Sequence, residues 1–62
     1  MPYVTIILRE GRGLDQKREM VKAVTEAIVR TTNAKPETVH IIVHEEPAHH
    51  LAHAGVLISD RI

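Results

Sequence analysis

Cysteine, phenylalanine and tryptophan are absent from the 62-residue sequence, and Tyr3 is its single aromatic residue. Without cysteine, the chain can form neither a disulfide nor a thiolate metal site. A nucleic-acid-binding domain normally presents a basic stripe and stacking aromatic residues, whereas eight basic and eight acidic residues here give a formal net charge of zero. The composition therefore excludes a disulfide scaffold and argues against a nucleic-acid partner.

Long apolar runs are also missing, since no segment approaches the roughly 20 residues of a membrane-spanning helix. No signal peptide precedes the domain either, so we expect a cytoplasmic protein without membrane contacts. Residues 1–62 correspond to a single small domain. A domain of this size usually needs disulfides, a metal or partner chains for stability. Because disulfides are excluded, we expect self-association.

The residues that are present predict two strands. The segment 3–8, YVTIIL, is rich in β-branched residues and apolar on both faces, which is typical of a strand buried on both sides. The segment 38–44, TVHIIVH, predicts the second strand. Residues 45–62 predict a turn-rich tail that ends in a small strand at 56–58.

Between the strands, the sequence predicts a polar loop at 9–13 and one helix from Gln16 to about Thr32. Asp15 is the expected N-cap of this helix, and Asn33 is the expected C-terminal stop. The apolar residues that recur at helical spacing are Met20, Val21, Val24, Ala27 and Ile28.

The order β-α-β predicts an α+β fold with two parallel strands joined by a helical crossover. One helix can cover only one face of a two-stranded sheet, yet both strands carry apolar residues on both faces. An exposed apolar face of this size marks an interface, so we expect another copy of the chain to cover it. The alternative is a monomer in which a helical tail folds back over the sheet.

Pro2 lies directly before the first strand, a position that tolerates its missing N–H group. If Met1 is removed, the Pro2 nitrogen becomes a secondary amine at the chain terminus, aimed by the rigid strand. Burial and nearby cations lower the pKa of such an amine towards neutrality, and a base of that pKa transfers protons efficiently. Pro2 is therefore a candidate general base.

Arg12 and His40 are the candidate partners of Pro2. Arg12 follows the far end of the first strand, which runs roughly 23 Å, so it could reach only the Pro2 of a neighbouring chain. His40 lies near the start of the second parallel strand and therefore belongs to the same end of the sheet as Pro2. A solvated loop arginine and an interface histidine are the alternative interpretations.

Four further histidines, His44, His49, His50 and His53, are unusual in so short a chain. His49 and His53 would share a face if their segment were helical, as in some metal-binding pairs. A zinc site needs three or four protein ligands, however, and one chain does not obviously supply them. We therefore predict no metal and expect these histidines to be solvated or to line a subunit interface.

The joint spacing of several short motifs resembles the 4-oxalocrotonate tautomerase family. These motifs are the N-terminal Met-Pro, the apolar strand, E-G-R at 10–12, D-Q-K at 15–17 and a second strand that ends in an acidic residue. The resemblance extends from Pro2 to about Asp60. It implies a β-α-β protomer, a dimer with a four-stranded sheet and commonly a hexamer built as a trimer of dimers.

The resemblance also implies a tautomerase that moves a proton between oxygen and carbon of a small 2-hydroxydienoate or related keto acid, without metal or organic cofactor. Pro2 would be the general base, and Arg12 of an adjacent subunit would bind the substrate carboxylate. Two positions depart from the best-known members, since His40 replaces an arginine and Leu51 replaces an aromatic residue. His40 would contact the oxygen end of the substrate, and Leu51 would help to exclude water.

Two alternatives keep the fold but change the activity. The same amine could catalyse hydration, dehalogenation or decarboxylation of a small unsaturated acid. The chain could also be a non-catalytic subunit of a hetero-oligomer, which either binds metal through its histidines or pairs with a related subunit that supplies the missing arginine.

Overall fold

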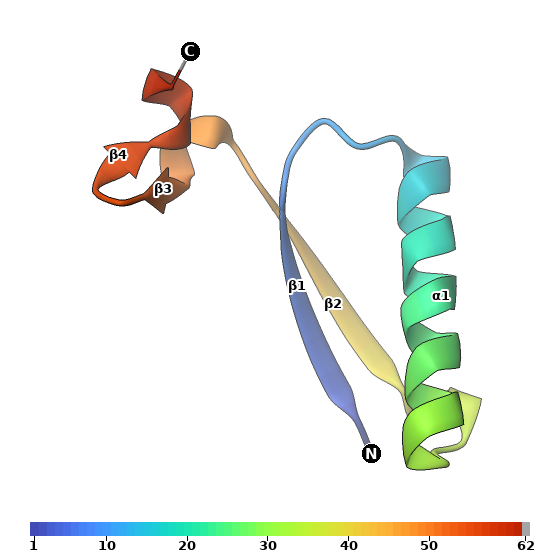
Figure 1. Cartoon of the computed structure of the whole chain (residues 1–62). Coiled ribbons are helices and arrows are strands. Elements are labelled where there is room, and N and C mark those ends of the chain that lie inside the picture. Colours follow the sequence, from blue (N-terminus) through green and yellow to red (C-terminus); the bar gives the residue numbers. More distant parts are fainter. Residues whose placement is uncertain (62) are drawn as a thin grey trace.

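The computed structural model describes residues 1–61 and contains one long helix beside a pair of parallel strands. Strand β1 (Tyr3–Arg9) leads through a loop to helix α1 (Leu14–Thr32), and a 3₁₀ turn (Pro36–Thr38) precedes strand β2 (His40–Glu46). Figure 1 shows β1 and β2 side by side, with α1 running alongside them. The predicted β-α-β arrangement with parallel strands is therefore confirmed.

The two strands pair along their whole length, with Tyr3 opposite His40 and Arg9 opposite Glu46. Exposure alternates along β1 and along β2 as far as His44, because successive side chains point to opposite faces of a sheet. The half-buried apolar residues of the face towards α1 are Val4, Ile6, Leu8, Ile41 and Val43. The opposite face, hereafter the open face, is exposed and consists of Tyr3, Thr5, Ile7, His40, Ile42 and His44.

Helix α1 begins two residues earlier than predicted. Gly13, not Asp15, is the N-cap residue, and the Gly13 N–H donates to Gln16 Oε1 at 3.0 Å. Asp15 instead lies in the first turn, where its negative charge favours the helix dipole, and accepts a hydrogen bond from Arg18 at 2.8 Å. Asn33 ends the helix as predicted, in a left-handed conformation (φ 63°) with its N–H bonded to the carbonyl of Val29.

The tail contains a hairpin where the sequence predicted a single small strand at 56–58. Strand β3 (Ala52–His53) pairs antiparallel with strand β4 (Val56–Leu57) across a turn in which Ala54 and Gly55 both have positive φ. A 3₁₀ turn flanks the hairpin on each side, at Ala48–His50 and Ile58–Asp60. Residues 48–61, hereafter the arm, project away from α1 in Figure 1.

The single chain has no closed core. None of residues 1–61 is buried, and the open-face residues Tyr3, Ile7 and Ile42 are 72%, 62% and 54% exposed. The chain exposes 4929 Å², whereas a compact protein of its mass exposes about 4,000 Å². Its radius of gyration is 14.5 Å, against about 11 Å for a compact chain of this length. The isolated chain therefore leaves a large apolar surface uncovered.

Within residues 1–61, no helix combines the length and the apolar character needed to cross a membrane.

Candidate active site

Pro2 and His40 lie together at one end of the sheet. The carbonyl oxygen of Pro2 accepts a hydrogen bond from the backbone N–H of His40 at 3.0 Å. The His40 imidazole stacks on the ring of Tyr3, with centroids 5.0 Å apart and planes inclined by 15°. The predicted proximity of Pro2 and His40 within one chain is confirmed, and these contacts fix the backbone of Pro2 at the start of β1.

The nitrogen of Pro2 is an amide while Met1 remains attached, and an amide nitrogen is not a base. Met1 is 76% exposed, so the peptide bond before Pro2 lies at the surface of the chain. Pro2 itself is half-buried. Any chemistry at this nitrogen therefore depends on removal of Met1.

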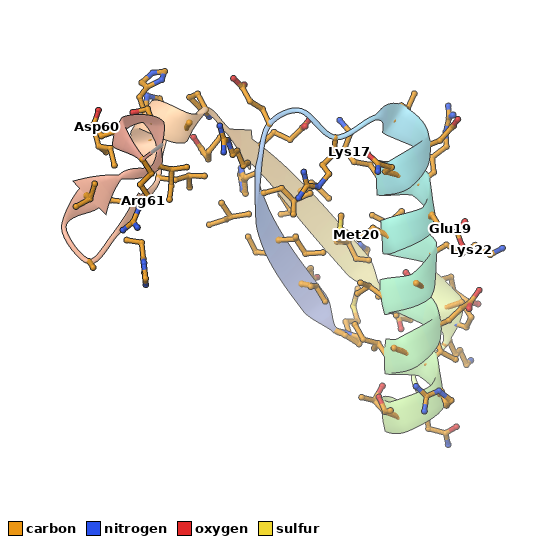
Figure 2. All side chains as sticks on the ribbon, turned by 45° about the horizontal axis from the view of Figure 1, so that its top comes forward. Lys17, Glu19, Met20, Lys22, Asp60 and Arg61 are labelled. Atoms are coloured by element: carbon orange, nitrogen blue, oxygen red, sulfur yellow. The ribbon has the colours of Figure 1, made fainter. Side chains whose placement is uncertain are left out.

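A pocket of about 180 Å³ lies at the opposite end of the strands, between β1 and the first turns of α1. Lys17 forms an ion pair with Glu45 near this pocket, with 2.6 Å between Lys17 Nζ and Glu45 Oε1. In Figure 2, Lys17 and Met20 lie on the side of α1 that faces the strands. The residues that line the pocket are Leu8, Arg12, Gln16, Lys17 and Met20.

The structure separates Pro2 from Arg12 within one chain. Pro2 precedes the seven-residue strand β1 and Arg12 follows it, so roughly 23 Å of extended chain lies between them. Figure 1 shows the N-terminus and the β1–α1 loop at opposite ends of the strands. Leu51, which is half-buried, belongs to the arm that follows the far end of β2. Of the predicted site residues, only His40 therefore lies beside Pro2 of the same chain.

The histidines of the arm do not form the helical pair that was considered for metal binding. The 3₁₀ turn ends at His50, and His53 lies on β3. The rings of His49 and His50 meet edge to face at 4.4 Å, and His50 Nδ1 lies 3.3 Å from Glu46 Oε2. Among residues 1–61, no three histidine, aspartate or glutamate side chains converge as metal ligands.

The sequence prediction did not identify Lys17 and Gln16, which line the pocket, or Glu45, which pairs with Lys17. Lys17 lies three residues before Met20 and is half-buried on the same side of the helix, so helical spacing could have placed it there. Glu45 continues the alternation of Ile41 and Val43 on the helix-facing side of β2. The pairing of the two charges depends on strand register and helix rotation, which the sequence pattern leaves open.

The fold is that of the tautomerases. The family model described as "Tautomerase enzyme" matches residues 2–61. The 2-hydroxymuconate tautomerase of Bacillus subtilis is 45% identical over 60 residues, which cover 97% of either chain. The chain therefore belongs to the tautomerase family.

Solved structures show the same relationship. The crystal structure of YwhB, a homologue of 4-oxalocrotonate tautomerase, superimposes with a TM-score of 0.95 at 43% identity, covering 98% of this chain and 100% of the other. A heterohexameric 4-oxalocrotonate tautomerase from Chloroflexus aurantiacus gives a TM-score of 0.92 at 27% identity, over 97% of each chain. The protein is accordingly an isomerase of the 4-oxalocrotonate tautomerase type, as the sequence motifs predicted.

Proposed function

We propose that the protein, once Met1 is removed, ketonises a small 2-hydroxydienoate with Pro2 as the general base. The observation that carries this proposal is the position of Pro2, which is half-buried at the rigid start of β1 with its carbonyl held by the N–H of His40 at 3.0 Å. The 45% identity to a 2-hydroxymuconate tautomerase supports this substrate class.

The active site is shared between chains in this proposal. Pro2 and Arg12 lie at opposite ends of β1, and the isolated chain leaves its open face uncovered. Both strands of the two-stranded sheet also have a free edge, which another chain can extend. If a two-fold axis lies beside that edge, the edge strands of the two chains run antiparallel. The Arg12 end of one chain then lies next to the Pro2 end of the other. Such a dimer has a four-stranded sheet, and three dimers make a hexamer.

The reaction is a proton transfer within the substrate. The Pro2 amine removes the hydroxyl proton of the enol, and the electrons of the oxygen form the carbonyl group. The distal carbon of the conjugated system then takes the proton back from the Pro2 ammonium. Arg12 of the neighbouring chain binds the carboxylate, His40 donates a hydrogen bond at the oxygen end, and Leu51 keeps water away from the amine.

The test is the rate of ketonisation of 2-hydroxymuconate by the Pro2→Ala variant, with loss of Met1 verified by intact mass. We expect kcat/KM to fall by about 10²–10⁴-fold, because a positioned general base contributes this much. Pro36→Ala, a change of the same type in the turn before β2, is the matched control and should retain activity. Full activity in a correctly processed Pro2→Ala protein contradicts the proposal, and so does an active native protein that retains Met1.

A further inference from the structure

We propose that Glu45, by pairing with Lys17, limits the Arg12 end of the site to one carboxylate. The inference rests on the proposed function for the reaction, but the binding preference that it assigns is a property of the pocket alone. Its basis is the ion pair between Glu45 and Lys17, in which Glu45 neutralises one of the two cations that line the pocket.

The two cations of the pocket differ in their partners. Lys17 Nζ lies 2.6 Å from Glu45 Oε1, and the side chains of this pair are only 26% and 32% exposed, so solvent screens their attraction less than at the surface. Arg12 forms no ion pair with any residue of the described chain, 1–61. The side chains at the pocket therefore leave one uncompensated positive charge, which belongs to Arg12.

Gln16 adds a neutral hydrogen-bond donor to the pocket. Its Oε1 atom accepts the N–H of Gly13 at 3.0 Å, and its amide NH₂ group supplies two hydrogen-bond donors. Together, the Arg12 guanidinium and the Gln16 amide can bind the two oxygens of one carboxylate. A second carboxylate would have to compete with Glu45 for Lys17, because the charge of Lys17 is already paired. The pocket therefore favours a substrate that carries one carboxylate at this end.

The local structure explains why Glu45 can perform this role. Strand β2 places Glu45 on the helix-facing side, opposite Leu8 of β1, and α1 presents Lys17 to the strands. The pair also connects the end of β2 to the second turn of α1, so it fixes the wall of the pocket. If the pair had a purely structural role, breaking it would lower the affinity for all ligands equally. In the proposed role, breaking the pair changes the ratio of the affinities for different ligands.

The test uses succinate and butyrate, four-carbon probes with two and one carboxylates, titrated into the assembled protein while the Arg12 and Gln16 amide resonances are followed by NMR. Glu45→Gln removes the charge but keeps the shape. We expect its affinity for succinate to rise about threefold to fivefold, as for a partly exposed charge pair, with little change for butyrate. Adding Lys17→Met to Glu45→Gln should cancel the gain.

Glu19→Gln is the matched control, because Figure 2 shows Glu19 on the side of α1 away from the strands. This variant should keep the wild-type ratio of the two affinities. An unchanged ratio in Glu45→Gln overturns the inference, as does an equal loss of affinity for both probes or the absence of any shift at Arg12 and Gln16. Because the titration requires no turnover, its result is independent of whether Pro2→Ala retains activity.

Discussion

At the scale of single residues, we propose that His40 influences what the end of the site beside Pro2 can bind. Its backbone N–H holds the Pro2 carbonyl, and its imidazole stacks on Tyr3. A histidine is not permanently charged near neutral pH and cannot form the two parallel hydrogen bonds that a guanidinium offers to a carboxylate. We therefore expect the end of the proposed site beside Pro2 to bind a neutral oxygen better than a second carboxylate.

Replacing His40 by arginine should shift the substrate preference of the protein towards dicarboxylic acids. We expect the KM for a dicarboxylic enol such as 2-hydroxymuconate to fall by at least about tenfold, because a charge-assisted hydrogen bond contributes about 1.5–3 kcal/mol. The KM for a monocarboxylic enol should stay within about twofold. Steady-state kinetics with both substrates measures the difference. His53→Arg adds the same charge in the arm and serves as the control. A His40→Arg protein with an unchanged ratio of KM values would contradict this view of the site.

At the scale of secondary-structure elements, the ends of α1 are controlled by backbone geometry. Asn33 adopts a left-handed conformation that closes the last turn through the Val29 carbonyl. Asparagine and glycine adopt this conformation readily, whereas β-branched residues do not. The helix therefore depends on this one position for its termination.

Asn33→Val should destabilise the protein by about 1–2 kcal/mol, the cost of a left-handed conformation for an ordinary side chain. Asn33→Gly should leave stability nearly unchanged. Thermal unfolding followed by circular dichroism, at one fixed protein concentration because assembly contributes to Tm, measures both. Equal Tm values for the valine and glycine variants would show that the conformation of residue 33 does not limit stability.

The elements that the sequence predicted well are those with a strong hydrophobic period. This period predicted the central helix and the two strands at 3–8 and 38–44. The predicted boundaries differ from the observed ones by at most two residues. The hairpin was missed because two-residue strands are too short to show a period. Its turn is Ala54–Gly55, which lacks the Asn-Gly or Asp-Gly pair that usually indicates such a hairpin.

The candidate site likewise combines a feature that the sequence predicted with one that it could not predict. The proximity of Pro2 and His40 follows from topology alone, because parallel strands begin at the same end of a sheet. The Lys17–Glu45 pair follows from strand register and helix rotation together, which only the three-dimensional structure provides.

At the scale of the whole molecule, we expect the protein to depend on a second chain that covers the exposed open face. Ile42 is 54% exposed at the middle of this face, beside His40 and His44 along β2. Ile42→Glu should prevent assembly, because burying an unpaired carboxylate costs several kcal/mol. Native mass spectrometry should then show monomers or an unfolded chain, with loss of tautomerase activity. Ala23→Glu, on the exposed surface of α1, is the control. An Ile42→Glu protein with a wild-type oligomeric state would place the interface elsewhere.

A shared site also predicts complementation between inactive variants. Pro2→Ala and Arg12→Ala should each be nearly inactive alone. When the two are unfolded, mixed in equal amounts and refolded together, chance association pairs an intact Pro2 with an intact Arg12 in roughly a quarter of the sites of a symmetric oligomer. Activity should recover to about that fraction. A mixture no more active than its components would mean that Pro2 and Arg12 act within one chain.

The arm has a consequence for the fate of chains that remain alone. Its elements contact mainly one another, and its tip at Ala54–Gly55 projects from the isolated chain. Exposed loop tips are preferred sites of proteolytic cleavage. We therefore expect a chain without partner subunits to be cleaved at this tip, and a chain whose tip is covered by neighbouring subunits to resist cleavage.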